Sequence, residues 1–103
     1  MFYHIDFLKF KPTVSESQAT SALNQLSKLK AEIPSMTNLS FGKHCSIQSL
    51  NKGYTHALVM QFADQAGRDA YVNHPEHQRI ASEVVAPLLD NGFESVIVID
   101  YEC

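Results

Sequence analysis

The chain has 103 residues, the size of one domain spanning residues 1–103, and its hydrophobic fraction of 45% excludes a disordered polymer. Its net charge of −3, without a basic block that would follow a phosphate backbone, argues against nucleic acid as a partner. No apolar run approaches the roughly 18 residues of a membrane span, and the start of the chain is too polar for a signal peptide. Cys45 and Cys103 form neither a CxxC nor a zinc pattern, so we expect free thiols and a cytoplasmic location.

The first predicted element is a strand over residues 2–11, which Pro12 ends. Because side chains alternate along a strand, one face carries Tyr3, Ile5 and Phe7, and the other carries Phe2, His4, Asp6, Leu8 and Phe10. Both faces are largely apolar, so we expect this strand to be covered on both sides.

A helix is predicted next, within residues 13–33. Residues 13–16 and 15–18 both fit the capping box that begins a helix, and Pro34 ends it. A single apolar stripe recurs at three- and four-residue spacing: Ala19, Ala22, Leu23, Leu26, Leu29 and Ile33. This spacing predicts an amphipathic helix with one face on a core.

Two strands joined as a hairpin are predicted over residues 39–50 and 55–62, with residues 51–53 as the turn. The first is polar, which is typical of an edge strand or one that faces a partner. The second alternates, so that His56, Leu58, Met60 and Phe62 point the same way.

Two short helices and a last strand complete the chain. Asp64 is the expected N-cap of a helix through Tyr71, and Pro75 fits the first turn of the next helix. The inward stripe of that second helix is His77, Ile80, Ala81, Val84 and Leu88. Pro87 kinks or ends it, residues 91–92 form a turn, and residues 93–101 are the last strand.

The order β-α-β-β-α-α-β predicts an α+β, ferredoxin-like fold, with helices on one face of a four-stranded antiparallel sheet. The other face of the sheet is also apolar. Soluble monomers rarely leave such a face exposed, so we expect a homodimer in which two sheets pack face to face as a dimeric α/β barrel.

An ordered set of residues carries a family resemblance over nearly the whole chain: His4, residues 33–34, Gly42, residues 53–57, Phe62, residues 71–77 and Asp100. With these residues the chain resembles the stress-responsive dimeric α/β-barrel family, Dabb. The resemblance implies the dimeric barrel, a stress-response role and mostly unassigned functions. One member is a plant polyketide cyclase that performs an aldol condensation with a tyrosine and histidines. His4, Tyr71 and His77 are similar to its site, and His56 is expected nearby.

The expected chemistry is proton abstraction next to a carbonyl group, without a cofactor. His77 would accept the proton, Tyr71 would polarise the carbonyl and His4 would position the ligand. The pocket is expected to be completed by His56, Asp6, Leu8, Leu58, Met60 and Ile80. Asp6 departs from the cyclase, which is apolar there, and this argues against a long alkyl-chain ligand.

Each of these histidines also has a structural interpretation. In this interpretation His74 caps a helix, and His4 and His56 are buried groups that bond each other or Asp100. No metal is expected, because the histidine spacing lacks a completing ligand set. The function is therefore left between a small-ligand binder with cyclase-type chemistry, a non-catalytic stress-response or structural dimer, and a cofactor-free or haem-binding monooxygenase of the dimeric-barrel group.

Overall fold

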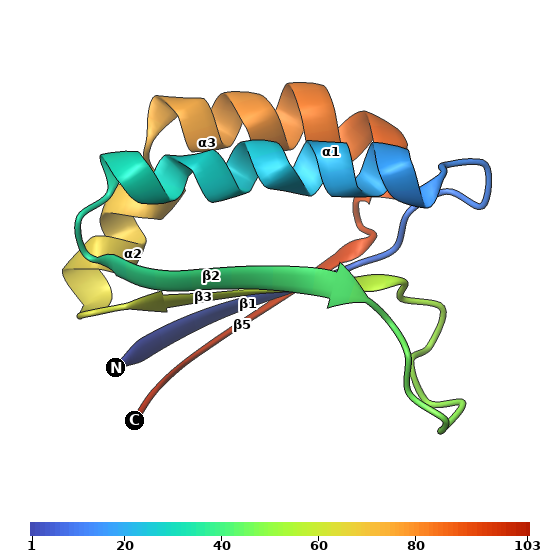
Figure 1. Ribbon diagram of the computed structural model, residues 1–103, viewed down its shortest axis with the longest axis horizontal. Coiled ribbons are helices and arrows are strands. Elements are labelled where there is room, and N and C mark those ends of the chain that lie inside the picture. Colours follow the sequence, from blue (N-terminus) through green and yellow to red (C-terminus); the bar gives the residue numbers. More distant parts are fainter.

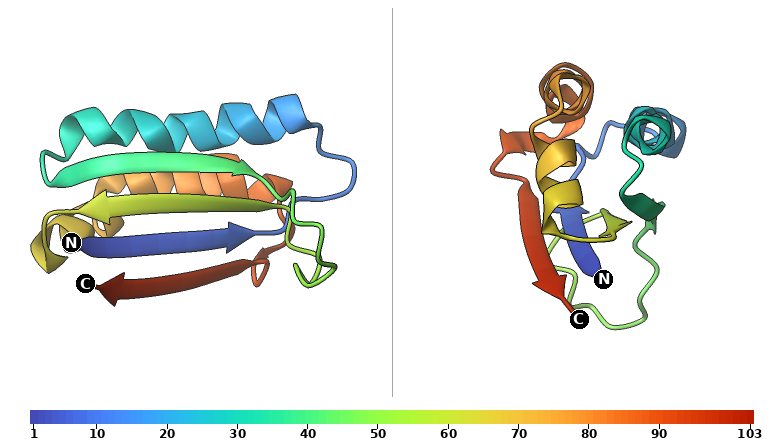
Figure 2. Two further views of the ribbon diagram at one scale, coloured as in Figure 1. Left: turned by 60° about the horizontal axis from the view of Figure 1, so that its bottom comes forward. Right: turned by 90° about the vertical axis from the view of Figure 1, so that its left-hand side faces the viewer.

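Four strands form one antiparallel sheet, and helices cover one of its faces (Figures 1 and 2). The computed structural model describes residues 1–103. The strands of the sheet lie in the order β2-β3-β1-β5. The elements in chain order are β1 (Phe2–Leu8), α1 (Glu16–Ser27), η1 (Lys28–Glu32), β2 (Met36–Lys43), β3 (His56–Phe62), α2 (Gln65–Val72), α3 (Pro75–Ile80), η2 (Ala81–Val85), η3 (Ala86–Leu88), β4 (Asp90–Phe93) and β5 (Val96–Glu102). This arrangement confirms the predicted ferredoxin-like fold.

The helix starts follow the capping signals of the sequence. Ser15 caps α1 and closes the capping box, since its hydroxyl accepts from the Gln18 amide while the Gln18 side chain accepts from the Ser15 amide. Asp64 caps α2 by accepting from the amide of Gly67. The side chain of His74 caps α3, which confirms its structural interpretation. None of the helices combines the length and the apolar character needed to cross a bilayer.

The core lies between the helices and the inner face of the sheet. The alternation of apolar residues along β1 and β3 predicted this location. Its buried side chains are Phe2, Leu8, Phe10, Ala19, Ala22, Leu23, Leu26, Leu29, Ile33, Met36, Leu58, Met60, Phe62, Tyr71, Ile80, Val85 and Leu89. His4 and His56 are buried among them. The layer is continuous from α1 across α3 to the sheet.

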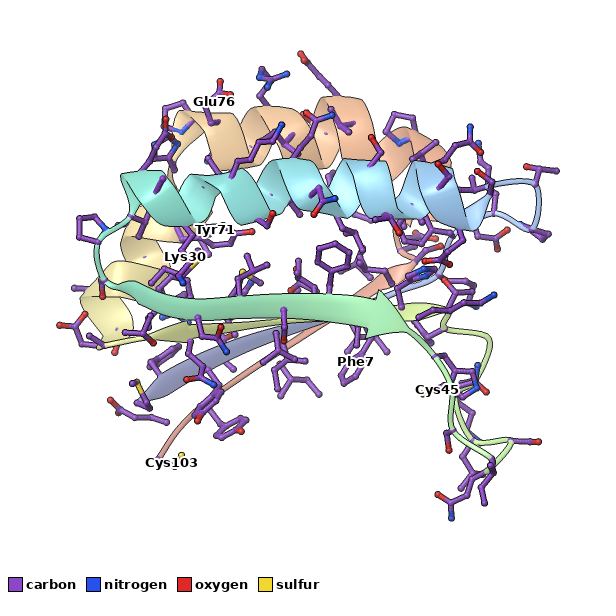
Figure 3. The ribbon with its side chains drawn as sticks, viewed as in Figure 1. Phe7, Lys30, Cys45, Tyr71, Glu76 and Cys103 are labelled. Atoms are coloured by element: carbon purple, nitrogen blue, oxygen red, sulfur yellow. The ribbon has the colours of Figure 1, made fainter.

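The outer face of the sheet is apolar and uncovered. Tyr3, Ile5 and Phe7 pair in register with Tyr101, Ile99 and Ile97 of β5, and the rings of Tyr3 and Tyr101 stack 4.8 Å apart. Half of the surface of Ile99 is exposed. Figure 3 shows Phe7 on the side of the sheet away from the helices. The predicted alternation of β1 is confirmed, and the cover expected over its outer face stays a prediction.

Three predicted boundaries were wrong. The strand predicted over residues 39–50 is β2, which starts earlier and ends at Lys43. Residues 44–55 form a loop that leaves the sheet (Figure 1), and its apolar side chains Ile47 and Leu50 are exposed. The predicted turn at 51–53 is present within this loop, with Lys52 and Gly53 at positive φ, but it does not join β2 to β3 directly.

The other two corrections concern the first and the last strand: β1 ends at Leu8, not at residue 11. The helix predicted from Pro75, with a kink or an end at Pro87, is confirmed. The helix that starts at Pro75 continues past Ile80 as a π-helical turn, η2, and then as the 3-10 turn η3, which contains Pro87. Proline has no amide hydrogen to donate and cannot continue an α-helical ladder. The strand predicted over 93–101 is β5, which begins only at Val96, after β4 and a turn at 94–95.

Candidate functional site

An apolar cavity of about 270 Å³ lies between the inner face of β1 and β5 and the helices α1 and α3. Three polar side chains, His4, Asp6 and His77, reach its wall. The other lining residues are Leu8, Leu26, Val72, Ala81, Val85, Leu89, Phe93, Val96 and Val98. Small-molecule sites are commonly apolar hollows with a few placed polar groups, so this cavity is the candidate site.

His77 is anchored in the first turn of α3, which Pro75 and the His74 cap begin. The Nδ1–H of its ring donates to the backbone carbonyl of Val72 at 3.1 Å. A carbonyl only accepts, so this contact places the ring hydrogen on Nδ1 and leaves Nε2 as a lone-pair acceptor. Burial lowers the pKa of His77 below its ordinary value of 6.5, which favours the neutral ring. The Nε2 atom of His77 is therefore free to accept a hydrogen bond or a proton.

Tyr71 lies at the C-terminal end of α2, between the helices and the sheet (Figure 3). Its ring centroid is 4.4 Å from that of His77 and 6.0 Å from that of His4. The side chain is fully buried, it does not line the cavity, and its hydroxyl has no hydrogen-bond partner. Burial, together with the nearby Asp6, raises the pKa of the Tyr71 hydroxyl, which stays neutral. The three predicted catalytic side chains are thus brought together.

His4 is held from the sheet side by a chain of charged groups. Its Nδ1–H donates to Oδ1 of Asp100 at 2.6 Å, and the other oxygen of Asp100 accepts from the guanidinium of Arg68 on α2. Nε2 of His4 lies 3.3 Å from Oδ1 of Asp6. The predicted bond between His4 and Asp100 is confirmed, whereas no bond joins His4 to His56. His4 is a rigid, oriented part of the wall.

Asp6 is a carboxyl group set in an apolar cavity. Its side chain is 13% exposed, and its Oδ1 has no hydrogen-bond partner, because the contact to His4 lacks the alignment of a hydrogen bond. Burial raises the pKa of Asp6 to about 6, against an opposing effect of His4. A buried ionisable group without a partner is costly, and such groups gather at functional sites.

The structure does not bring His56 to this cavity, contrary to the expectation. In the antiparallel register His56 pairs with Leu8, whereas His4 pairs with Met60 toward the other end of β3. The two ring nitrogens of His56 bond the Thr55 hydroxyl at 2.8 Å and the Glu16 carboxylate at 3.0 Å. His56 is a satisfied group that ties β3 to the start of α1.

The predicted pocket residues divide between the cavity wall and the closed core. Asp6 and Leu8 line the cavity. Leu58, Met60 and Ile80 point inward as predicted but are almost wholly buried in the core and do not reach the wall. Sequence reasoning missed Val96 and Val98, although alternation along the last strand places them on the same face. It also missed Leu89 and Phe93, because no pattern predicted the path of the segment after Pro87.

The histidines and carboxylates of the chain do not assemble a metal centre. No group of three or more His, Cys, Asp or Glu side chains is arranged to hold an ion. Cys45, in the loop, and Cys103, at the C-terminus, lie far apart and unpaired (Figure 3).

The fold and the cavity define a ferredoxin-like α+β protein with a site between its sheet and its helices that is open on the side of Phe93 and Val98. Residues 2–103 match the family described as Stress responsive A/B Barrel Domain, Dabb, and the chain belongs to this family. Stress-response A/B barrel domain-containing protein HS1 of Arabidopsis thaliana is 29% identical over 99 residues, covering 96% of this chain and 86% of that protein. Olivetolic acid cyclase of Cannabis sativa is 26% identical over 98 residues, covering 95% of this chain and 92% of the cyclase.

A solved structure shows the same arrangement. It is a dimeric ferredoxin-like protein of unknown function from Jannaschia sp. CCS1, 26% identical, with a TM-score of 0.87. The match covers 99% of this chain and 98% of that chain. The family resemblance and the fold expected from the sequence are confirmed, and the solved relative is dimeric.

Proposed function

We propose that this chain binds a small organic carbonyl compound in the cavity and that His77 removes a proton from the carbon next to the carbonyl group. The observation that carries the proposal is the setting of His77. Its Nδ1 is fixed by the Val72 carbonyl, and its Nε2 is left without a protein partner in the wall of an apolar cavity. The similarity to olivetolic acid cyclase supports this proposal.

The proton transfer needs no cofactor. Nε2 of His77 takes the proton, the electron pair of the C–H bond forms a C=C bond, and the carbonyl oxygen becomes an enolate oxygen. Tyr71, kept neutral by burial, is proposed to steady that negative charge, and His4 to fix the adjacent wall. Tyr71 lies behind the wall, so its contact with a ligand requires a shift of the His77 ring.

Exchange of α-protons for deuterium tests the proposal without knowledge of the natural substrate. Acetophenone and other small methyl ketones are incubated with the protein in D2O, and loss of the methyl signal is followed by proton NMR. We expect His77→Gln to slow the exchange by roughly 10²–10⁴, the usual weight of a general base. His56→Ala is the matched control and should leave the rate unchanged, because His56 lies outside the cavity.

Two outcomes contradict the proposal. One is that none of these ketones exchanges faster with the wild-type protein than without it. The other is that His77→Gln keeps the exchange rate but loses about 1–3 kcal/mol of stability, as expected when a buried group only serves to satisfy a partner. Binding of a ketone without exchange would favour the second candidate, a non-catalytic ligand binder, which the two satisfied histidines His4 and His56 support.

The assembly we propose is a homodimer that packs two outer sheet faces together, as the dimeric relative and the exposed Ile97, Ile99 and Tyr101 support. A cytoplasmic location and the absence of nucleic acid and membrane as partners stay predictions. The same holds for the monooxygenase alternative, which no observation favours.

A further inference from the structure

Asp6 is the one acidic side chain that lines the cavity, and the proton abstraction by His77 does not account for it. The surrounding wall is apolar apart from His4 and His77. Placing a carboxylate there without a hydrogen bond to Oδ1 works against the stability of the fold. An apolar side chain would fill the same position on β1 at no such cost. A role in the chemistry of the cavity would explain the residue.

The charged and titratable groups around Asp6 come from four elements. His4 lies on β1 itself, Asp100 on β5 is paired with Arg68 of α2, Tyr71 comes from α2, and His77 faces the cavity from α3. Asp100 pairs with Arg68 and accepts a hydrogen bond from the His4 ring, and its negative charge still favours the protonated form of Asp6. No lysine or arginine reaches Asp6, and the one nearby group that opposes its protonated form is His4, whose effect is smaller than that of burial.

We propose that Asp6 is the proton donor of this cavity and gives its proton to the carbonyl oxygen of the ligand that His77 deprotonates. This inference rests on the proposed function and extends it to the ligand, which would be a small ketone or aldehyde whose oxygen lies at the Asp6 end. An alkyl chain placed against Asp6 would displace water from the carboxyl group without offering it a hydrogen-bond partner. The cavity of about 270 Å³ also suits a small compound.

The transfer balances without a further reactant. The α-carbon loses a proton to Nε2 of His77, and the electron pair of the broken C–H bond moves to form the C=C bond. The carbonyl oxygen gains the O–H bond as the Asp6 carboxyl gives up its proton and becomes a carboxylate. The products are an enol, a protonated His77 and an ionised Asp6, and the reverse transfers restore both groups. Acid and base thus act on one ligand from two walls of the cavity.

The required protonation states predict a bell-shaped dependence on pH. Asp6 must carry its proton, which it loses as the pH rises through about 6. His77 must be neutral, and it gains a proton as the pH falls through its own pKa, which burial sets below 6.5. The exchange rate is therefore expected to be highest in weakly acidic solution and to fall about tenfold for each pH unit above the pKa of Asp6.

The test compares the wild-type protein with Asp6→Asn and Asp6→Leu, using acetophenone exchange in D2O from about pH 4 to about pH 8. Asparagine keeps the size and can donate a hydrogen bond, but it cannot transfer a proton. We expect Asp6→Asn to bind acetophenone with an affinity close to wild type, measured by ligand-observed NMR. Its exchange should be slower by roughly 10²-fold at the optimum and should lack the fall above pH 6. Asp6→Leu should be at least as slow.

The results separate this inference from the proposed function. Wild-type exchange that depends on His77, combined with an unchanged rate and pH profile in both Asp6 variants, overturns the role of Asp6 and leaves the proposed function standing. Absence of wild-type exchange overturns the proposed function and the inference with it. Both Asp6 variants must show the circular dichroism of the wild type. Asp6→Asn keeps the size and shape of the side chain, so it still tests the proposal if Asp6→Leu fails to fold.

Discussion

Three histidines of this chain occupy three different settings, and their partners decide what each can do. His4 donates to Asp100 and His56 is bound on both ring nitrogens, so these two rings are largely committed to holding the fold. His77 bonds only through Nδ1, and its other nitrogen is free. The sequence placed all three on inward faces by their alternation and helical spacing. It offered Asp100 as a partner for His4, which is correct, but it did not predict Glu16 as the partner of His56, because Glu16 lies 40 residues away from that ring.

Asp6 makes the stability of the protein depend on pH in a direction that is unusual for an aspartate. Its pKa rises from 3.8 to about 6 on folding, so the folded state binds the proton more tightly than the unfolded chain. The ionised form is therefore destabilising, and stability falls as the pH rises from about 4 to about 6 and then levels off. Below about pH 4 both states carry the proton and the effect vanishes.

Asp6→Asn is expected to remove this dependence. The gain in unfolding free energy of the variant over the wild type should grow by roughly 2 kcal/mol between about pH 4 and about pH 7.5, and urea unfolding at fixed protein concentration measures it. An equal difference at both pH values would show that Asp6 is not buried in the unfavourable setting described for it.

At the scale of elements, local signals fixed most of the structure. The capping residues Ser15 and Asp64 and the proline at position 75 mark the helix starts correctly, because caps and prolines act through their immediate neighbours. The extent of β2 was wrong because a polar edge strand and a polar loop share the same composition. The π turn at residues 81–85 left no sequence pattern, although Ala81 and Val85 of this turn line the cavity.

The cavity itself was only partly predictable for a related reason. Alternation along β1 identified His4, Asp6 and Leu8 as neighbours on one face, and the structure places all three in the wall. Whether a residue on an inward face borders a hollow or fills the core depends on which helix passes over it. Leu58 and Met60 have the same alternation but lie in the filled part of the core. The position of the cavity depends on the path of the helix after Pro75. That path is set by contacts with residues far away in the sequence.

At the scale of the whole molecule, the uncovered face of the sheet is the feature to explain. Helices shield one side, and the other presents the pairs Ile5–Ile99 and Phe7–Ile97 to the outside. At about 25 cal/mol per Å² of buried apolar surface, covering such a face stabilises an assembly considerably. A second copy supplies the same apolar surface by twofold symmetry.

We expect sedimentation at low micromolar concentration to show one species of about twice the 11.5 kDa mass of the chain. Ile99→Lys should shift this species toward the monomer, because it places a charge in the interface. Ser21→Lys on α1, which adds the same single charge at an exposed position on the helix side, is the matched control and should remain dimeric. A wild-type monomer, or a dimer that both variants leave intact, would contradict the sheet-to-sheet assembly.

The central claim is that His77 is a neutral base whose Nε2 is free in the cavity, and nitrogen NMR of the histidine rings tests it most directly. Spectra of the wild type, with His77→Gln to assign the signal, report both the tautomer and the pKa of the ring. The account predicts the hydrogen on Nδ1, as the Val72 carbonyl requires, and a pKa below 6.5. A ring with its hydrogen on Nε2, or one that stays protonated at neutral pH, would contradict it.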